Sequence, residues 1–138
     1  MIHLDTNLLI AATDPADLHV PVYIAVLDKG LPMGASACAW TEYHSRPVDP
    51  QTEKLLLQML RGGIVPFDEE TAILAGELFF QTGSKRRTRM DCMIAATAIR
   101  AGAELATTDP EDFAAFVPYG LKLHPTSHAL NVPSAPDA

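Results

Sequence analysis

Four acidic residues stand in otherwise apolar or small-residue surroundings. They are Asp5, Glu42, Asp91 and Asp109, with Asp112 as a nearby fifth. A carboxylate in such surroundings is costly without a partner, because burial strips its charge of water. Mg²⁺ and Mn²⁺ are suitable partners, since these hard cations take oxygen ligands. One or two such ions can hold a phosphodiester, activate a water molecule and stabilise the leaving oxygen. The acids therefore indicate metal-dependent phosphodiester chemistry.

The elements that must position these acids indicate an α/β fold. Strands alternating with helices imply a parallel sheet with helices on both faces, and the site of such a sheet lies beyond the carboxyl ends of its strands. Asp5 and Asp109 follow two predicted strands. Short apolar runs predict strands at 2–4, 31–35, 64–66, 104–106 and 121–123. Periodicity and capping residues predict helices at 8–12, 17–29, from 37 past Glu42, and at 51–60, 68–81, 90–101 and 112–116.

Each acid also has a structural interpretation. Asp5 is a candidate cap for the helix that follows it, and Glu42 fits an exposed helix position. The segment from Thr88 to Asp91 fits a capping box. Asp109 before Pro110 fits an N-cap with proline at the first helical position. Independent caps do not require this order of acids along the chain, so it is the set that favours a site.

The motifs together resemble those of a PIN-domain nuclease. They are Leu4-Asp5-Thr6-Asn7, the strand-to-helix passage from Ser36 to Glu42, Asp91 followed by Ile94-Ala95-Ala96, and the stretch from Leu105 through Thr107 and Asp109 to Asp112-Phe113. The resemblance covers residues 1–124. The length of the chain makes it similar to the stand-alone VapC-type toxins of type II toxin–antitoxin pairs.

The resemblance implies an α/β/α sandwich with a central parallel sheet of four to five strands. It also implies a Mg²⁺- or Mn²⁺-dependent endoribonuclease that cleaves tRNA, rRNA or mRNA by metal-activated water, with one or two ions. By residue match, the catalytic metal cluster comprises Asp5, Glu42, Asp91 and Asp109. Asp112 matches a further metal-binding position. Thr6, Asn7 and Thr107 match supporting positions, where hydroxyl and amide groups orient the carboxylates.

A basic segment leads directly into Asp91. Lys85, Arg86, Arg87 and Arg89 are four of the ten basic residues of the chain. Charge runs are commonly solvated loops. Adjacency to Asp91 favours a second interpretation, in which the four side chains guide RNA phosphates toward the metal ions.

The net charge of −7 argues at first against a nucleic-acid partner. If the four cluster acids hold metal, however, 13 acidic residues remain against 10 basic ones, and bound cations make the cluster attract phosphate. The length of 138 residues predicts one nuclease domain at 1–124, with a tail rich in Pro, Ser and Ala at 125–138. The chain shows no signal peptide and no apolar stretch long enough for a membrane span, which predicts a cytoplasmic protein without membrane contact.

The resemblance implies two protein partners, a second copy in a homodimer and a VapB-like antitoxin that blocks the site. Six apolar residues are candidates for a partner surface, although ordinary core packing is the commoner role: Leu55, Leu56, Met59, Leu60, Phe79 and Phe80. Two other functions stay open. One is a PIN-type nuclease in RNA processing without an antitoxin, and the other is a non-catalytic α/β binding or receiver module.

Overall fold

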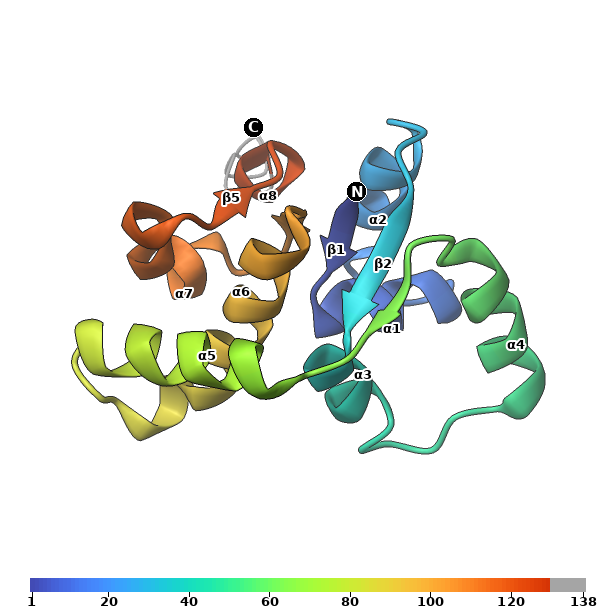
Figure 1. The fold of residues 1–138 in the computed structure, drawn as a ribbon. Coiled ribbons are helices and arrows are strands. Elements are labelled where there is room, and N and C mark those ends of the chain that lie inside the picture. The colour runs from blue at the N-terminus through green and yellow to red at the C-terminus, as the bar shows by residue number, and fades with distance from the viewer. Residues whose placement is uncertain (130–138) are drawn as a thin grey trace.

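A five-stranded, wholly parallel sheet forms the centre of the molecule (Figure 1). The computed structural model describes residues 1–129. The strand order is β3-β2-β1-β4-β5, so the strand nearest the N-terminus lies in the middle. This confirms the predicted α/β architecture. The strands are β1 (Ile2–Leu4), β2 (Met33–Ser36), β3 (Gly63–Val65), β4 (Glu104–Ala106) and β5 (Lys122–Leu123).

Helices cover both faces of the sheet. Helices α1, α2 and α4 lie on one side in Figure 1, and α5, α6 and α7 lie on the other. The change of side follows from the right-handedness of parallel crossovers, because the chain runs from β1 outward to β3 and then crosses back to β4. The helices are α1 (Thr6–Thr13), α2 (Val20–Leu27), α3 (Ala37–Tyr43), α4 (Pro50–Met59), α5 (Glu69–Gln81), α6 (Arg89–Ala101), α7 (Pro110–Phe113) and α8 (Thr126–Ala129), with 3₁₀ helices η1 (Arg86–Thr88) and η2 (Ala114–Tyr119). Within the described residues, no helix is long and apolar enough to cross a membrane.

The central strand β1 is completely buried, which agrees with the apolar Ile2 and Leu4 on either side of His3. Ile2 pairs with Met33 of β2 on one side and with Glu104 of β4 on the other. Helix α6 packs a row of small and apolar residues against this core and ends at Gly102, whose positive φ of 65° suits glycine. Helix α6 thus packs against strands β4 and β2 of the sheet.

The predicted C-terminal tail begins with an ordered helix. Helix α8 falls within 125–138, and its residue Ser127 is buried. The Ser127 hydroxyl accepts a hydrogen bond from the Thr107 amide (3.0 Å) and donates one to the Leu105 carbonyl (3.4 Å). Residues up to 129 are therefore tied to β4, and the rest of the predicted tail lies outside the described residues. The domain boundary at 124 stays a prediction.

His3 of β1 is a buried polar residue whose two ring nitrogens have no hydrogen-bond partner within residues 1–129. Burial lowers the pKa of its ring to about 4, so the imidazole is neutral. An unsatisfied buried polar group costs about 1–3 kcal/mol. We expect His3→Leu, which preserves approximate volume, to raise the free energy of unfolding by about 1 kcal/mol or more in urea denaturation at pH 7.5. Unchanged or lower stability would show that the ring nitrogens are satisfied.

Candidate metal and nucleic-acid site

The carboxyl ends of β1 and β4 form the site, at the point where the strand order changes direction. Asp5 follows β1 directly, and its amide donates a hydrogen bond to the Ala106 carbonyl of β4 (3.0 Å). This bond continues the pairing of the two strands by one residue. It brings Asp5 beside Thr107, although about one hundred residues separate them in the sequence.

A hydrogen-bonded chain fixes Asp5 and Asp109 relative to each other. The buried carboxylate of Asp5 accepts from the Thr6 amide (2.8 Å) and from the Thr107 hydroxyl (2.7 Å). The same Thr107 hydroxyl accepts from the Asp109 amide (3.0 Å). Thr107 therefore contacts both Asp5 and Asp109, and the Asp5 carboxylate also caps α1.

Two polar residues at the start of α1 contact the other acids. Thr6 donates through its hydroxyl to Glu42 Oε1 (2.7 Å). Asn7 donates through Nδ2 to Asp109 Oδ2 (3.3 Å) and to the Thr108 hydroxyl (3.0 Å). Thr108 also donates to Asp109 Oδ2 (3.3 Å) and was missed by the sequence reasoning, which had only its position after a strand as a signal.

Glu42 and Asp91 come from two helices, α3 directly after β2 and α6 directly after η1. Ser36 ends β2 and caps α3 through its side chain, which accepts from the Ala39 amide (3.0 Å). Glu42 lies in the last turn of the short helix α3 and is half-buried. Asp91 is half-buried in the first turn of α6, and Asp112 is exposed on α7.

The capping interpretations of Asp91 and Asp109 are not realised. Thr88 makes no side-chain capping bond to α6; its hydroxyl donates to the Lys85 carbonyl instead (2.7 Å). Asp109 precedes α7 without a side-chain capping bond. Neither carboxylate is therefore engaged in satisfying a helix terminus, and both are free to act in the cluster.

Electrostatics show that the five acids lie within reach of one another. Burial is the largest cause that raises the pKa of Asp91, and the neighbouring charges of Asp5, Asp112, Glu42 and Asp109 add to it in that order, for a pKa of about 7. Burial also raises the pKa of Asp5 to about 6, against the lowering effect of its hydrogen bonds from Thr107 and Thr6. The site therefore holds more negative charge than it can accommodate without a cation or protons.

The donor set fits a hard divalent cation in kind, since all five side chains offer carboxylate oxygens that share one region of the molecule. Within residues 1–129, however, no three Asp, Glu, His or Cys side chains already stand in the arrangement of a closed metal site. Carboxylates that share one region repel one another, and a divalent cation held by them would offset that repulsion.

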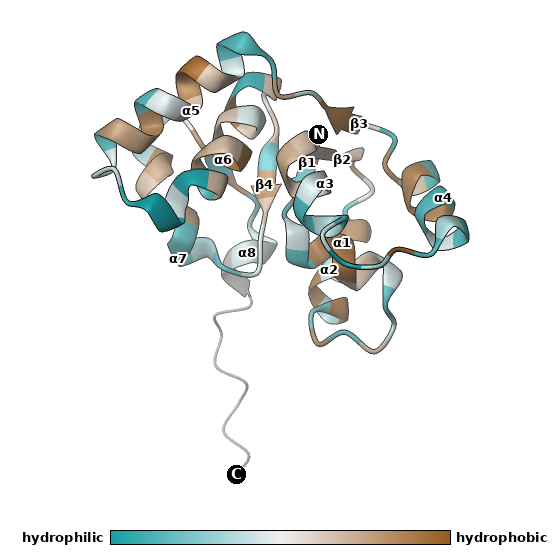
Figure 2. Ribbon diagram, turned by 90° about the horizontal axis from the view of Figure 1, so that it is seen from below, coloured by the Kyte–Doolittle hydropathy of each residue, from teal (hydrophilic) through white to brown (hydrophobic). Residues whose placement is uncertain are grey.

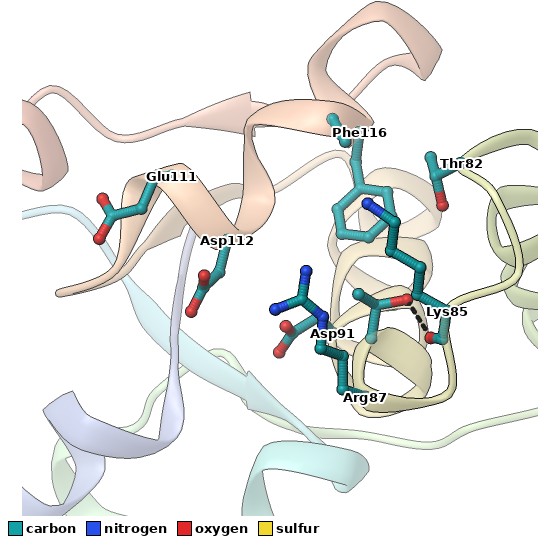
Figure 3. Close-up of a pocket in the computed structure, with 9 residues that line it drawn as sticks. Thr82, Lys85, Arg87, Asp91, Glu111, Asp112 and Phe116 are labelled. Carbon is teal, nitrogen blue, oxygen red and sulfur yellow. Dashed lines mark hydrogen bonds between the residues drawn. The ribbon is translucent and has the colours of Figure 1, made fainter.

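The four residues of the basic segment differ in whether they reach this site. Lys85 and Arg87 line a pocket of about 280 Å³ that also contains Asp91, Glu111 and Asp112 (Figure 3). Arg86 and Arg89 do not line it. The guanidinium of Arg89 lies 5.1 Å from the ring centroid of Phe79 on α5. Glu111 is the second residue at the site that sequence reasoning missed.

Thr107 offers a direct test of the supporting role. We expect Thr107→Val to weaken divalent-metal affinity about 10- to 100-fold, because Asp5 and Asp109 both lose the contact that orients them. Isothermal calorimetry with Mn²⁺ measures this. Thr97→Val is the matched control, since Thr97 is equally buried but its hydroxyl donates within α6, to Met93. Equal losses in both variants would assign the effect to general destabilisation.

Comparison with known proteins gives one family match and several similar structures. A family model described as PIN domain matches residues 2–116. FitAB bound to a DNA fragment is 25% identical, with a TM-score of 0.66 over 90% of this chain and 94% of that one. VapBC2 from Rickettsia felis, bound to promoter DNA, is 21% identical, with a TM-score of 0.66 over 90% and 98%, and shows likeness of fold. A toxin–antitoxin complex from Klebsiella pneumoniae is 25% identical, with a TM-score of 0.61 over 83% and 91%. A search of curated proteins found no match.

Proposed function

The chain belongs to the PIN-domain family, and from that membership we propose that it is a Mg²⁺- or Mn²⁺-dependent endoribonuclease and the toxin of a type II toxin–antitoxin pair. PIN domains are nucleases, which makes the chain a hydrolase acting on nucleic acid and sets aside the receiver alternative. The observation that carries the finer proposal is the convergence of Asp5, Glu42, Asp109 and Asp112 on Asp91, whose pKa is raised to about 7 by burial first and then by these four charges.

The five carboxylates would hold the cation, which PIN nucleases generally use. When bound, a divalent cation supplies a water molecule of lowered pKa and stabilises negative charge on the leaving oxygen. The protein contributes position. Thr107 and Thr6 hold Asp5 and Glu42 in fixed rotamers, and Asn7 holds Asp109. The apolar body of α6 supports Asp91 from beneath and limits its hydration, which strengthens its interaction with a cation.

The proposed antitoxin partner rests on two observations. Two of the similar structures, those from R. felis and K. pneumoniae, are named as VapBC2 and as a toxin–antitoxin complex. The surface of α4 also exposes Leu55 (56%) and Met59 (37%), which line an apolar groove of about 430 Å³ with residues of α1 and α2. An amphipathic helix of a VapB-like antitoxin would bury this groove.

The structure sorts the remaining partner candidates. Leu56 and Leu60 are buried in the core, and Phe79 is partly buried. Phe80 is 75% exposed on α5, where Figure 2 shows hydrophobic residues alternating with hydrophilic ones. We assign the α5 face to the proposed homodimer. Co-expression with the product of an adjacent small open reading frame separates the toxin from a PIN nuclease without an antitoxin: rescue of growth supports the former.

Incubation with total RNA tests the proposed activity. We expect discrete cleavage products with Mg²⁺ or Mn²⁺ and none in EDTA, and mapping of the cleaved ends identifies the target RNA. Equal cleavage in EDTA would contradict the metal requirement. Absence of cleavage of any RNA with either ion would contradict the ribonuclease assignment.

A further inference from the structure

The pocket beside the carboxylate cluster has walls of opposite charge. Lys85 and Arg87 reach into it from the segment that precedes α6, and Glu111 and Asp112 come from α7 on the other wall (Figure 3). Asp91 lies between the two walls in the first turn of α6. Two members of the carboxylate cluster, Asp91 and Asp112, thus also line the pocket, so the pocket adjoins the place where the proposed cations would bind.

The positively charged side chains of Lys85 and Arg87 are available to a ligand. The ion pairs within residues 1–129 involve Arg100 and His44, and neither Lys85 nor Arg87 takes part in one. This holds although three carboxylates line the same pocket. Lysine and arginine heads beside a cavity of about 280 Å³ fit a phosphate group with part of its nucleotide.

The other two basic residues of the segment differ in their surroundings. Arg89 begins α6 on the side of α5, where its guanidinium lies over the Phe79 ring, and it lines a separate apolar pocket with Phe67 and Met93. Arg86 is exposed in η1 and lines neither pocket. A 3₁₀ helix turns by about one third of a circle per residue, so consecutive side chains point in different directions.

We propose that Lys85 and Arg87 bind the RNA phosphate that neighbours the scissile phosphate, and that Arg86 and Arg89 do not contact the substrate there. This inference rests on the proposed ribonuclease function. The scissile phosphate must lie at the carboxylate cluster, so the next phosphate along a strand lies one nucleotide away. The pocket adjoins the cluster, because it shares Asp91 and Asp112 with it, and its basic residues Lys85 and Arg87 can therefore receive that next phosphate. Glu111 repels the same phosphate and sets it against the basic wall.

The salt dependence of RNA binding tests whether Lys85 and Arg87, and not Arg86 and Arg89, contact the phosphate. We would use an Asp5→Asn background, which prevents cleavage, and a labelled single-stranded RNA that the unmodified protein cleaves. Lys85→Gln and Arg87→Gln should each reduce the slope of log affinity against log salt, and the double variant should reduce it by about 0.7, the value for one phosphate contact on a single strand. Arg86→Gln and Arg89→Gln remove the same charge and should leave the slope unchanged. Glu111→Gln should tighten binding. Equal slope losses in all four basic variants, or a larger loss in Arg89→Gln, would overturn the proposal.

Neutral substrate analogues locate the contact. Methylphosphonates placed singly along the mapped RNA should weaken binding to the Asp5→Asn protein at a position adjacent to the scissile bond, and that loss should vanish in the Lys85→Gln, Arg87→Gln double variant. A loss that persists in the double variant would overturn the inference. If the unmodified protein cleaves RNA while these patterns fail, only the inference falls. If it cleaves no RNA, the proposed function falls as well.

Discussion

Replacing Asp91 by Asn is expected to lower the rate of RNA cleavage at least about 100-fold, the upper end of the cost of disturbing a metal site's outer partners. The reason is the central position of Asp91, whose carboxylate feels the charges of all four other acids. Asn keeps the shape of the side chain but supplies no negative charge. End-labelled RNA followed over time with Mn²⁺ in excess gives the rate.

Asp28→Asn is the matched control for this prediction. Asp28 is exposed at the end of α2, before β2 begins. It therefore lies toward the amino ends of the strands, whereas the cluster lies at their carboxyl ends. The same chemical change there should leave the cleavage rate within a factor of about two, since surface substitutions away from such features are usually small in effect. Full cleavage by Asp91→Asn would remove Asp91 from the proposed metal site.

The Asp91→Asn substitution is also expected to stabilise the protein when no divalent cation is present. The pKa of Asp91 is about 7 in the folded protein against an ordinary value of 3.8, so the folded state binds protons more tightly than the unfolded state. The penalty for ionising Asp91 is absent below pH 3.8, grows as the pH rises to about 7, and is complete above it. At pH 8 in EDTA, Asp91→Asn should raise the free energy of unfolding by about 1–2 kcal/mol, discounted because the group is half-exposed.

Divalent cations should make the unmodified protein more stable than Asp91→Asn. A cation that binds only the folded protein adds about 2.7 kcal/mol at one hundred times its dissociation constant. We expect Mn²⁺ to stabilise the unmodified protein by this order and Asp91→Asn much less. Thermal unfolding at pH 5 and pH 8, with EDTA or Mn²⁺, measures both effects. A stability gain that is equal at the two pH values in EDTA would contradict the assigned pKa shift.

The strands and helices follow closely from the sequence, because their signals are local. The apolar run 2–4 stops at Asp5, and the periodic segment ending at Gly102 forms α6 as expected. The strand order is not local. Nothing within either segment shows that β1 and β4 are neighbours, and it is that pairing which brings Asp5 beside Thr107.

Predictions at the site were limited because the sequence shows local patterns but not contacts between distant residues. Asp91 and Asp109 match capping patterns as well as metal-binding patterns, and only the geometry shows that neither caps through its side chain or through a capping box. Thr108 escaped notice because its contact with Asn7 joins residues far apart in the chain. The basic segment looked uniform, because a run of charges does not reveal the direction of each side chain along η1 and into α6.

Calorimetric titration of Mn²⁺ into the unmodified protein and into Asp91→Asn tests the central claim most directly, because it requires no knowledge of the RNA. At pH 6.5 we expect saturable binding to the unmodified protein with release of protons from Asp5 and Asp91, whose pKa values are about 6 and 7, visible as a dependence of the heat on the buffer. Asp91→Asn should bind at least about 10-fold more weakly. Identical titrations of the two proteins, or no binding to either, would contradict a divalent-metal site formed by these carboxylates.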